Sequence, residues 1–386
     1  MERMQKLHPE FTYEIVNFDT KGDQILNIAL PKIGDKGLFT KELEDALETA
    51  RIDFVVHSLK DMPCQTLPDG LILAGVPERE DPSDALVMSK RWENVKFSLD
   101  DLAENSVIGT SSLRRISQLK QKYPQFKFET IRGNLQTRFS KLDDPVEKKF
   151  DAIILATAGL IRMSYKDRIT QILPPESCMH AVSQGALGIE CRRDDWFVIK
   201  MLNELNHEET VLRCIAERTF LAKLEGGCSA PVGVASTVTN DSILLEGVVL
   251  DLDGSRRIQD KFEINFDASL DNLDCPILNQ LNVDLSASNA EARVDEHGFR
   301  GVPPDEYNKS LKRVLDGDHE ADDDEDRKRV KLNNEKLRHY SFITDMNISA
   351  NKMIRAELCG LHLAEKLKER GADVLINEVK AIVHKS

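Results

Sequence analysis

The stretch with the clearest chemical potential is Val-Val-His-Ser-Leu-Lys-Asp-Met-Pro, residues 55–63. An apolar, β-branched run of Ile52, Phe54, Val55 and Val56 predicts a buried strand that leads into it, and Pro63 ends the pattern. Ser58, Lys60 and Asp61 therefore follow the carboxyl end of a strand, where ligands bind in open α/β sheets. A hydroxyl, an ammonium and a carboxylate there suit a charged ligand. The alternative is a loop with a solvated Lys–Asp pair, which would contribute little.

Three further predicted strands, at 107–109, 128–131 and 152–155, end in a similar way. Each leads through a small or polar turn into a helical pattern with arginine: Thr110, Ser111, Ser112, Arg114 and Arg115 after the first, Arg132, Gly133, Asn134 and Arg138 after the second, and Arg162 after the third. Because these residues all follow strand ends, we expect the polar chemistry to collect at one edge of the sheets.

Arg114 and Arg115 raise a specific question, because they fall in the first turn of a predicted helix. Cationic side chains there oppose the positive end of the helix dipole. An anion bound at the helix N-terminus would resolve the conflict. The alternative is that both arginines point into water.

The overall charge limits what the chain can bind. The net charge is −14, which argues against nucleic acid as a general partner. The arginines at the strand ends then form a local cationic pocket in an acidic protein, which suits a small polyanion. No apolar run approaches the roughly 18 residues of a membrane span, and the first residues lack the apolar core of a signal peptide. We therefore expect no membrane association.

The seven cysteines are scattered, without the spacing of a metal site. This favours a reduced, cytosolic compartment. Cys228 differs from the others because it directly follows Gly226 and Gly227, on a loop with little packing to do. Most single cysteines are inert core residues, but one on an accessible loop can react.

The elements that position these residues alternate as in βαβ units. Residues 11–18 alternate like a strand, and Thr40 caps a predicted helix through Ala50. We therefore expect parallel sheets with helices on both faces. The segment 77–82 indicates a crossing into a second unit that extends to about residue 175, and 181–188 indicates the return.

A third unit is predicted from Asn206, which with Glu209 resembles a capping box at a helix start. Antiparallel strands should follow over 232–251, with a turn at Asp253-Gly254. Acidic and basic blocks within 267–334 predict a disordered insertion, whose basic cluster could alternatively be a nuclear-localisation patch. An amphipathic helix over 351–370 and a last strand over 374–379 complete the prediction.

Four motifs together resemble one known family, hydroxymethylbilane synthase, also called porphobilinogen deaminase. They are Val56-His57-Ser58-Leu59-Lys60-Asp61, Gly109-Thr110-Ser111-Ser112-Leu113-Arg114-Arg115, Arg132-Gly133-Asn134 and Leu224-Glu225-Gly226-Gly227-Cys228. The match covers roughly residues 10–265 and resumes over 340–380.

The resemblance implies an α/β fold of three domains. The first two (1–78 with about 178–200, and 79–177) would resemble type II periplasmic binding proteins. The third (204–386) would be a small α+β domain with an antiparallel sheet.

The resemblance also implies the activity. A transferase would join four porphobilinogen molecules head to tail, release ammonia, and make the linear tetrapyrrole of haem biosynthesis. A dipyrromethane cofactor would be attached to Cys228 through a thioether, and no metal would be needed. We further expect a cytoplasmic monomer.

Site roles carried over from the family fall into three groups. Asp61 and Lys60 would be catalytic. Cofactor-binding residues would be Cys228, Lys60, Ser58, Thr110, Ser111, Ser112, Arg114, Arg115 and Gly133. Substrate-binding residues would be Arg132, Asn134, Arg138, Arg162, Lys36, Phe39 and Gln184. Arginine and hydroxyl donors match the acetate and propionate groups of porphobilinogen, and the Asp61 carboxylate could stabilise the cation left when ammonia departs.

Two departures from the family pattern qualify the resemblance. The family's first strand, with its Thr-Arg-x-Ser-type turn, has no counterpart before Met1, and Ser183 stands where the family usually has glycine. The first departure motivates an alternative function, an amino-terminally truncated and catalytically impaired isoform that binds tetrapyrrole-like anions.

Overall fold

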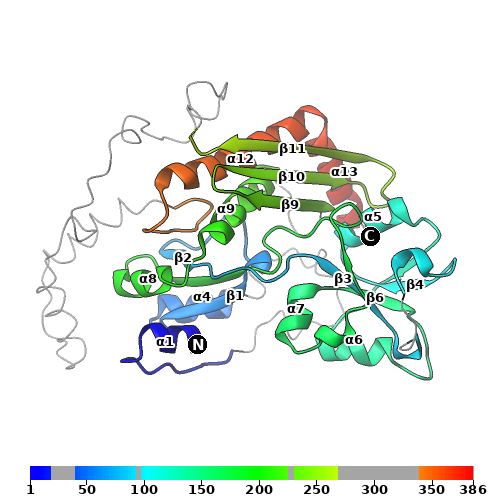
Figure 1. Cartoon of the computed structure of the whole chain (residues 1–386), viewed down its shortest axis with the longest axis horizontal. Helices are drawn as coiled ribbons and strands as arrows, with labels where there is room; N and C mark the ends of the chain where they lie inside the picture. The colour runs from blue at the N-terminus through cyan, green and yellow to red at the C-terminus, as the bar shows by residue number, and fades with distance from the viewer. Residues whose placement is uncertain (19–39, 93–96, 225–229, 268–338, 386) are drawn as a thin grey trace, which may run out of the picture. The chain divides into compact units, whose positions relative to one another are not determined.

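The computed structural model describes residues 1–18, 40–92, 97–224, 230–267 and 339–385, and within these ranges the strands form three sheets (Figure 1). None of the helices in these ranges is long and apolar enough to span a bilayer. The predicted insertion lies almost wholly outside the described residues.

The first sheet has the order β1-β8-β2. Its strands are β1 (Phe54–Ser58), β8 (Leu187–Arg192) and β2 (Leu71–Gly75). Both neighbours run antiparallel to β8, with Val56 opposite Ile189. Helices α4 (Lys41–Glu48) and α8 (Trp196–Asn203) contact the sheet, and α1 (Glu2–Leu7) precedes them in the chain. Leu47 of α4 packs with Val55 and Leu71, so apolar burial holds β1 in place.

The second sheet has the order β5-β4-β6-β3-β7. Its strands are β3 (Asp84–Met88), β4 (Val107–Gly109), β5 (Lys127–Glu129), β6 (Ala152–Ala156) and β7 (Gln171–Leu173). Strands β5, β4 and β6 are parallel, whereas β3 runs antiparallel to β6 and β7. Helices α5 (Leu113–Lys122), α6 (Leu135–Leu142) and α7 (Thr157–Arg162) follow β4, β5 and β6.

Alternate residues of β3 and β6 enter two different apolar clusters. Leu86 and Ile154 pack with Leu119 of α5, whereas Val87 and Ile153 pack with Phe139 of α6. Both faces of the second sheet are therefore buried, as predicted. The prediction of parallel sheets was wrong, because β3 runs antiparallel to both of its neighbours in the second sheet and β8 runs antiparallel to both of its neighbours in the first.

The third sheet is an antiparallel meander of β9 (Val232–Val238), β10 (Ser242–Leu250) and β11 (Arg257–Asn265). Gly254 adopts a φ of +79° in the β10–β11 turn, as the Asp-Gly pair predicts. Helices α9 (Glu208–Lys223) and α12 (Ala350–Glu369) pack against each other and contact this sheet (Figure 1). Helix α13 (Ala372–Lys385) follows Gly371. Short 3-10 turns are η1 (Leu59–Asp61), η2 (Lys90–Trp92), η3 (Leu99–Asp101) and η4 (Lys166–Arg168).

Three local predictions were wrong. Residues 374–379 are helical, because Leu375, Ile376 and Val379 are buried at helical spacing while Val374 is exposed. The segment 11–18 forms no strand, and Ile15 and Val16 are exposed. His207 rather than Asn206 is the N-cap of α9, since the Asn206 amide instead bonds the backbone of Val76 and Ala74.

Candidate functional site

The first motif forms the end of β1 and the turn η1. Leu59 is fully buried and its N–H donates to the Ala186 carbonyl at 3.0 Å, which fixes the start of the turn. Ser58 and Asp61 are exposed beside it. Burial lowers the pKa of Lys60, partly opposed by the neighbouring Asp61 carboxylate. Asp61 is thus an accessible carboxylate at a strand end next to a partly desolvated ammonium.

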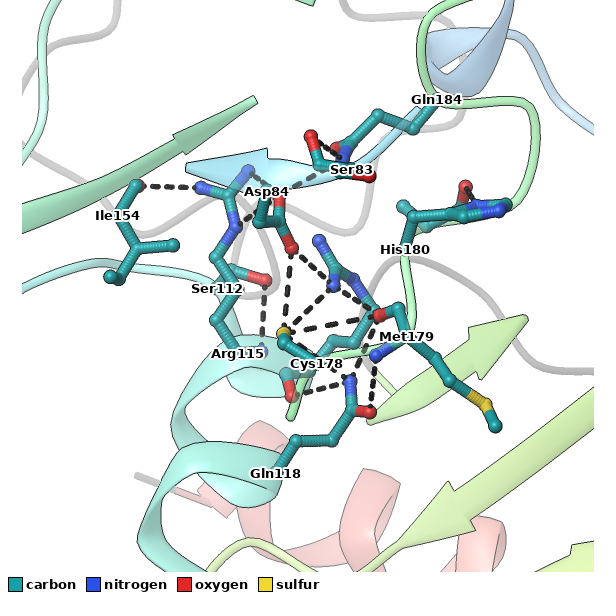
Figure 2. A network of polar contacts seen from close by, with 12 residues as sticks. Ser83, Asp84, Ser112, Arg115, Gln118, Ile154, Cys178, Met179, His180 and Gln184 are labelled. Carbon is teal, nitrogen blue, oxygen red and sulfur yellow. Dashed lines mark hydrogen bonds and ion pairs between the residues drawn. The ribbon is translucent and has the colours of Figure 1, made fainter. Parts of the chain in front are cut away.

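Asp84, the first residue of β3, lies at the centre of a buried ion cluster (Figure 2). Arg114 Nη1 donates to its Oδ2 at 2.7 Å, and Arg115 donates to its Oδ1 from Nη2 at 2.7 Å and from Nε at 3.0 Å. Although burial alone would raise the pKa of Asp84, the two guanidinium groups hold it well below its usual range. Asp84 is therefore ionised.

Further polar groups complete this cluster. Arg114 Nη1 also donates to the Met179 carbonyl, and Arg115 Nη1 donates to the Ile154 carbonyl. Gln184, which is fully buried, donates from Nε2 to Asp84 Oδ1 at 2.9 Å. The anion that resolves the conflict at the start of α5 is thus the chain's own Asp84. The alternative of solvent-directed arginines was wrong, since Arg114 and Arg115 are 6% and 7% exposed.

The second arginine motif is built around the start of α6. Gly133 has a φ of +109°, and Asn134 caps the helix by accepting from Thr137 N–H at 2.9 Å. Arg138 Nε donates to the Gly133 carbonyl at 2.8 Å. Arg132 Nη1 is buried and has no hydrogen-bond partner among the described residues. A buried guanidinium nitrogen without a described partner is a candidate contact point for a bound anion.

The remaining predicted residues have local partners. Ser111 is exposed and its Oγ donates to the Ile131 carbonyl, whereas Thr110 is buried and Ser112 is the N-cap of α5. Arg162 Nη2 donates to the Gly185 carbonyl at 2.6 Å, and burial lowers its pKa.

The charged side chains of the Asp61 turn and of the two arginine motifs are close enough to affect one another's pKa values. Lys60 experiences the charges of Arg114 and Arg115, so the end of β1 and the start of α5 face a common region. Burial lowers the pKa of Arg138, and the positive charges of Arg115 and Arg132 lower it further. Within the described residues Arg132, Arg138 and Arg162 form no ion pair with a carboxylate. This excess of positive charge suits a ligand with several carboxylates.

Three predicted residues, Cys228, Lys36 and Phe39, lie outside the described residues. Sequence reasoning missed Asp84 and the buried pair of Arg79 with Glu217, whose closest atoms are 2.7 Å apart. It also gave no role to the His57–Glu190 contact at 3.0 Å. A signal for Asp84 existed, because an acidic residue that opens an apolar strand must find a cationic partner when it is buried.

Comparison with protein-family models gives two matches that cover most of the chain. Residues 1–200 match "Porphobilinogen deaminase, dipyromethane cofactor binding domain", and residues 211–278 match "Porphobilinogen deaminase, C-terminal domain".

Curated relatives agree with these matches. The porphobilinogen deaminase of Synechococcus elongatus is 51% identical over 258 residues, which are 67% of this chain and 79% of the relative. That of a Nostoc species is 49% identical over 67% of this chain and 78% of its own. That of a Prochlorococcus marinus strain is 50% identical over 69% and 82%.

Solved structures give much weaker similarities. A periplasmic sulfonate-binding protein, SsuA from Methylobacillus flagellatus, has a TM-score of 0.24 at 16% identity, covering 46% of this chain and 50% of that one. YhfZ from Shigella flexneri has a TM-score of 0.23 at 13% identity, covering 50% and 76%. At such scores they carry no argument about the fold.

Proposed function

The chain belongs to the porphobilinogen deaminase family, and we propose how its residues divide the work of that family's reaction. The reaction is the head-to-tail condensation of porphobilinogen with release of ammonia, which gives hydroxymethylbilane. The observation that carries the proposal is the cluster of arginines beside an exposed carboxylate, Asp61, at the joined strand ends.

The residues present suit the dipyrromethane cofactor that the family model names. We propose that Cys228 holds it covalently. The buried, unpartnered Arg132 Nη1 and the accumulated positive charge around Arg138 are the features that its carboxylates would satisfy. When bound, this group supplies the pyrrole end to which substrate units are added.

Arg114 can contribute to the same binding although it is paired with Asp84. A guanidinium has five N–H donors, and the hydrogen bonds of Arg114 to described residues all run from Nη1. Its Nε and Nη2 are then the donors proposed for a cofactor carboxylate. Arg115 uses Nε, Nη1 and Nη2 within the chain, so its role is mainly to hold Asp84 and the start of α5. Gln184 belongs to the same support rather than to substrate contact, because it too bonds Asp84.

Asp61 acts on the substrate. Loss of ammonia leaves the porphobilinogen methylene carbon electron-poor, and a carboxylate beside it stabilises the developing positive charge. Lys60, whose pKa is lowered by burial, adds a donor for a substrate carboxylate next to it. Ser58 is an exposed hydroxyl that can donate to a remaining acidic group, and the exposed Ser111 hydroxyl can do so once it releases its bond to the Ile131 carbonyl.

The division into three domains with the boundaries predicted above is part of this proposal, as are a monomeric state and a cytoplasmic location. Each of the three sheets would be the centre of one domain.

The test is Asp61→Asn, which keeps the shape and removes the charge. We expect kcat to fall by roughly 10²-fold or more, the scale for one well-placed electrostatic stabiliser, with little change in KM. Asp69→Asn, on the exposed loop before β2, is the matched control and should keep full activity. Near-normal turnover in Asp61→Asn would refute the assignment.

Intact mass combined with a turnover assay separates this function from the impaired-isoform alternative. Protein that carries one dipyrromethane yet forms no uroporphyrin from porphobilinogen after oxidation would support the impaired isoform. Loaded protein that turns over excludes it.

A further inference from the structure

Arg218 lies in the middle of α9 and has an exposed fraction of 0%. A buried guanidinium is costly unless its donors are satisfied. In the described part of the chain Arg218 forms no ion pair with a carboxylate, and its partners are backbone carbonyls. Because this fully buried guanidinium donates to backbone carbonyls, it fixes the conformation of the backbone segments that carry them.

Two of those carbonyls belong to the residues that directly follow Asp61. Arg218 Nη2 donates to Pro63 O at 2.6 Å and Nη1 donates to Met62 O at 3.4 Å. A third, longer bond runs from Nε to Ser341 O at 3.4 Å. Arg218 therefore connects the third-sheet helix α9 to the turn that carries Asp61.

The turn is fixed on its other side as well. Leu59 is fully buried and its N–H donates to Ala186 O at 3.0 Å. Asp61 itself is exposed and stands between these two attachments. Without Arg218, the chain after Asp61 would lose the short 2.6 Å bond that holds Pro63 O.

Arg218 is itself held rigidly. The preceding residue, Glu217, pairs with Arg79 at 2.7 Å and accepts the Ser183 N–H at 2.7 Å, which ties α9 to both segments that cross between the first and second sheets. Because the helix cannot shift easily, the guanidinium offers the Asp61 turn a fixed reference point.

We propose that Arg218 is a positioning residue for Asp61, an inference that rests on the catalytic role proposed above for that carboxylate. It sets where the carboxylate lies and does not touch the substrate. Displacements of about 1 Å at a catalytic group can cost roughly 10²-fold in rate, so the contact should appear in kcat rather than in KM.

The experiment compares Arg218→Met and Arg218→Lys with Arg355→Met in the full-length, cofactor-loaded protein. Arg355 is a matched control: it is 5% exposed, lies on α12 and donates to the carbonyls of Asn265 and Asn351, away from the Asp61 turn. We expect Arg218→Met to lower kcat by about 10-fold to 100-fold with KM changed less than about twofold. Arg218→Lys, which can still reach one carbonyl, should fall in between, and Arg355→Met should keep kcat within about twofold.

A second readout is independent of turnover. Hydrogen exchange of the amides over 59–65, followed by mass spectrometry, should accelerate in Arg218→Met but not in Arg355→Met. The proposal is overturned if kcat of Arg218→Met stays within about twofold of wild type, or falls no more than that of Arg355→Met. If Arg218→Met does not fold, Arg218→Lys decides, since wild-type kcat and wild-type exchange in that variant would equally refute positioning.

Asp61→Asn distinguishes this failure from failure of the proposed function. Normal turnover in Asp61→Asn refutes the catalytic role of Asp61. A slow Asp61→Asn beside a fast Arg218→Met refutes only the positioning role. If both inferences hold, the double variant Asp61→Asn with Arg218→Met should be scarcely slower than Asp61→Asn alone. Once the carboxylate charge is gone, displacing the side chain costs no further rate.

Discussion

Two sets of charges in this chain, one fully buried and one partly buried, behave differently. Asp84 with Arg114 and Arg115, and Glu217 with Arg79, balance each other inside the protein. Arg132, Arg138 and Glu357 have no partner of opposite charge within ion-pair distance among the described residues. Balanced charges define the structure at the strand ends, whereas unbalanced charges are left to respond to ligands or to protons. The arginines of the Arg114-Arg115 motif and those around the start of α6 therefore do different work.

The largest expected effect comes from breaking the balanced set with Asp84→Asn. This leaves two buried guanidinium groups without their carboxylate, which should cost about 3–5 kcal/mol in the free energy of unfolding. Urea unfolding measures it. Asp143→Asn is the control, because its bond to Arg168 is less buried and should be worth about 1 kcal/mol or less. Equal losses in the two variants would contradict the special status of Asp84.

The next effect concerns the unbalanced set. Arg132→Met should weaken porphobilinogen or cofactor binding by about 10-fold to 100-fold, since a charge-assisted hydrogen bond is worth about 1.5–3 kcal/mol. Stability should change by no more than about 0.5 kcal/mol, because no described partner is lost. KM and the loaded fraction by intact mass are the measurements, and Lys127→Met, at an exposed position of β5, is the control. A large stability loss with unchanged KM would place Arg132 in the balanced set, whose charges hold the structure together.

The sequence could predict which residues gather but not how they pair. Apolar runs and breakers predicted the strand that ends at Gly109, and they placed the ends of two others within two residues, since β1 continues past Val56 to Ser58 and β5 ends at Glu129 rather than Ile131. The pairing of Arg114 and Arg115 with Asp84 is a long-range contact between β3 and α5, and local patterns do not encode such contacts. The helix over 372–385 was misread for a related reason, since a short window around Val374 hides a helical period that extends to Val383.

The pH dependence of stability tests the role of Glu357, which belongs to the unbalanced set. Burial raises the pKa of its carboxyl to about 7, against the opposing hydrogen bond from the Ser341 backbone. The folded state then binds more protons than the unfolded state between the ordinary glutamate pKa and about 7, so this group's contribution to stability falls as pH rises across that window. A tenfold difference in proton affinity between the folded and unfolded states corresponds to about 1.4 kcal/mol.

Glu357→Gln should therefore raise the free energy of unfolding at pH 8 by about 2–3 kcal/mol relative to its effect at pH 4.5. Chemical unfolding of both proteins at the two pH values measures the difference. Glu365→Gln, on the same helix but paired with Lys223 near the surface, is the control and should show no such gain. A pH-independent difference would mean that Glu357 is ionised at no special cost.

The smallest effect tests the backbone beneath the balanced charges. Ser183 has a φ of +59°, in the left-handed region, and its N–H donates to Glu217 Oε2. A non-glycine residue pays roughly 1–2 kcal/mol for this conformation, and glycine loses part of that gain through greater freedom in the unfolded chain. Ser183→Gly should accordingly stabilise the protein by about 0.5–1 kcal/mol. Ser183→Ala separates backbone from side chain, because alanine keeps the left-handed cost while removing the hydroxyl. If alanine stabilises as much as glycine, the cost lies in burying the hydroxyl; if only glycine does, it lies in the backbone that supports the Arg79–Glu217 pair.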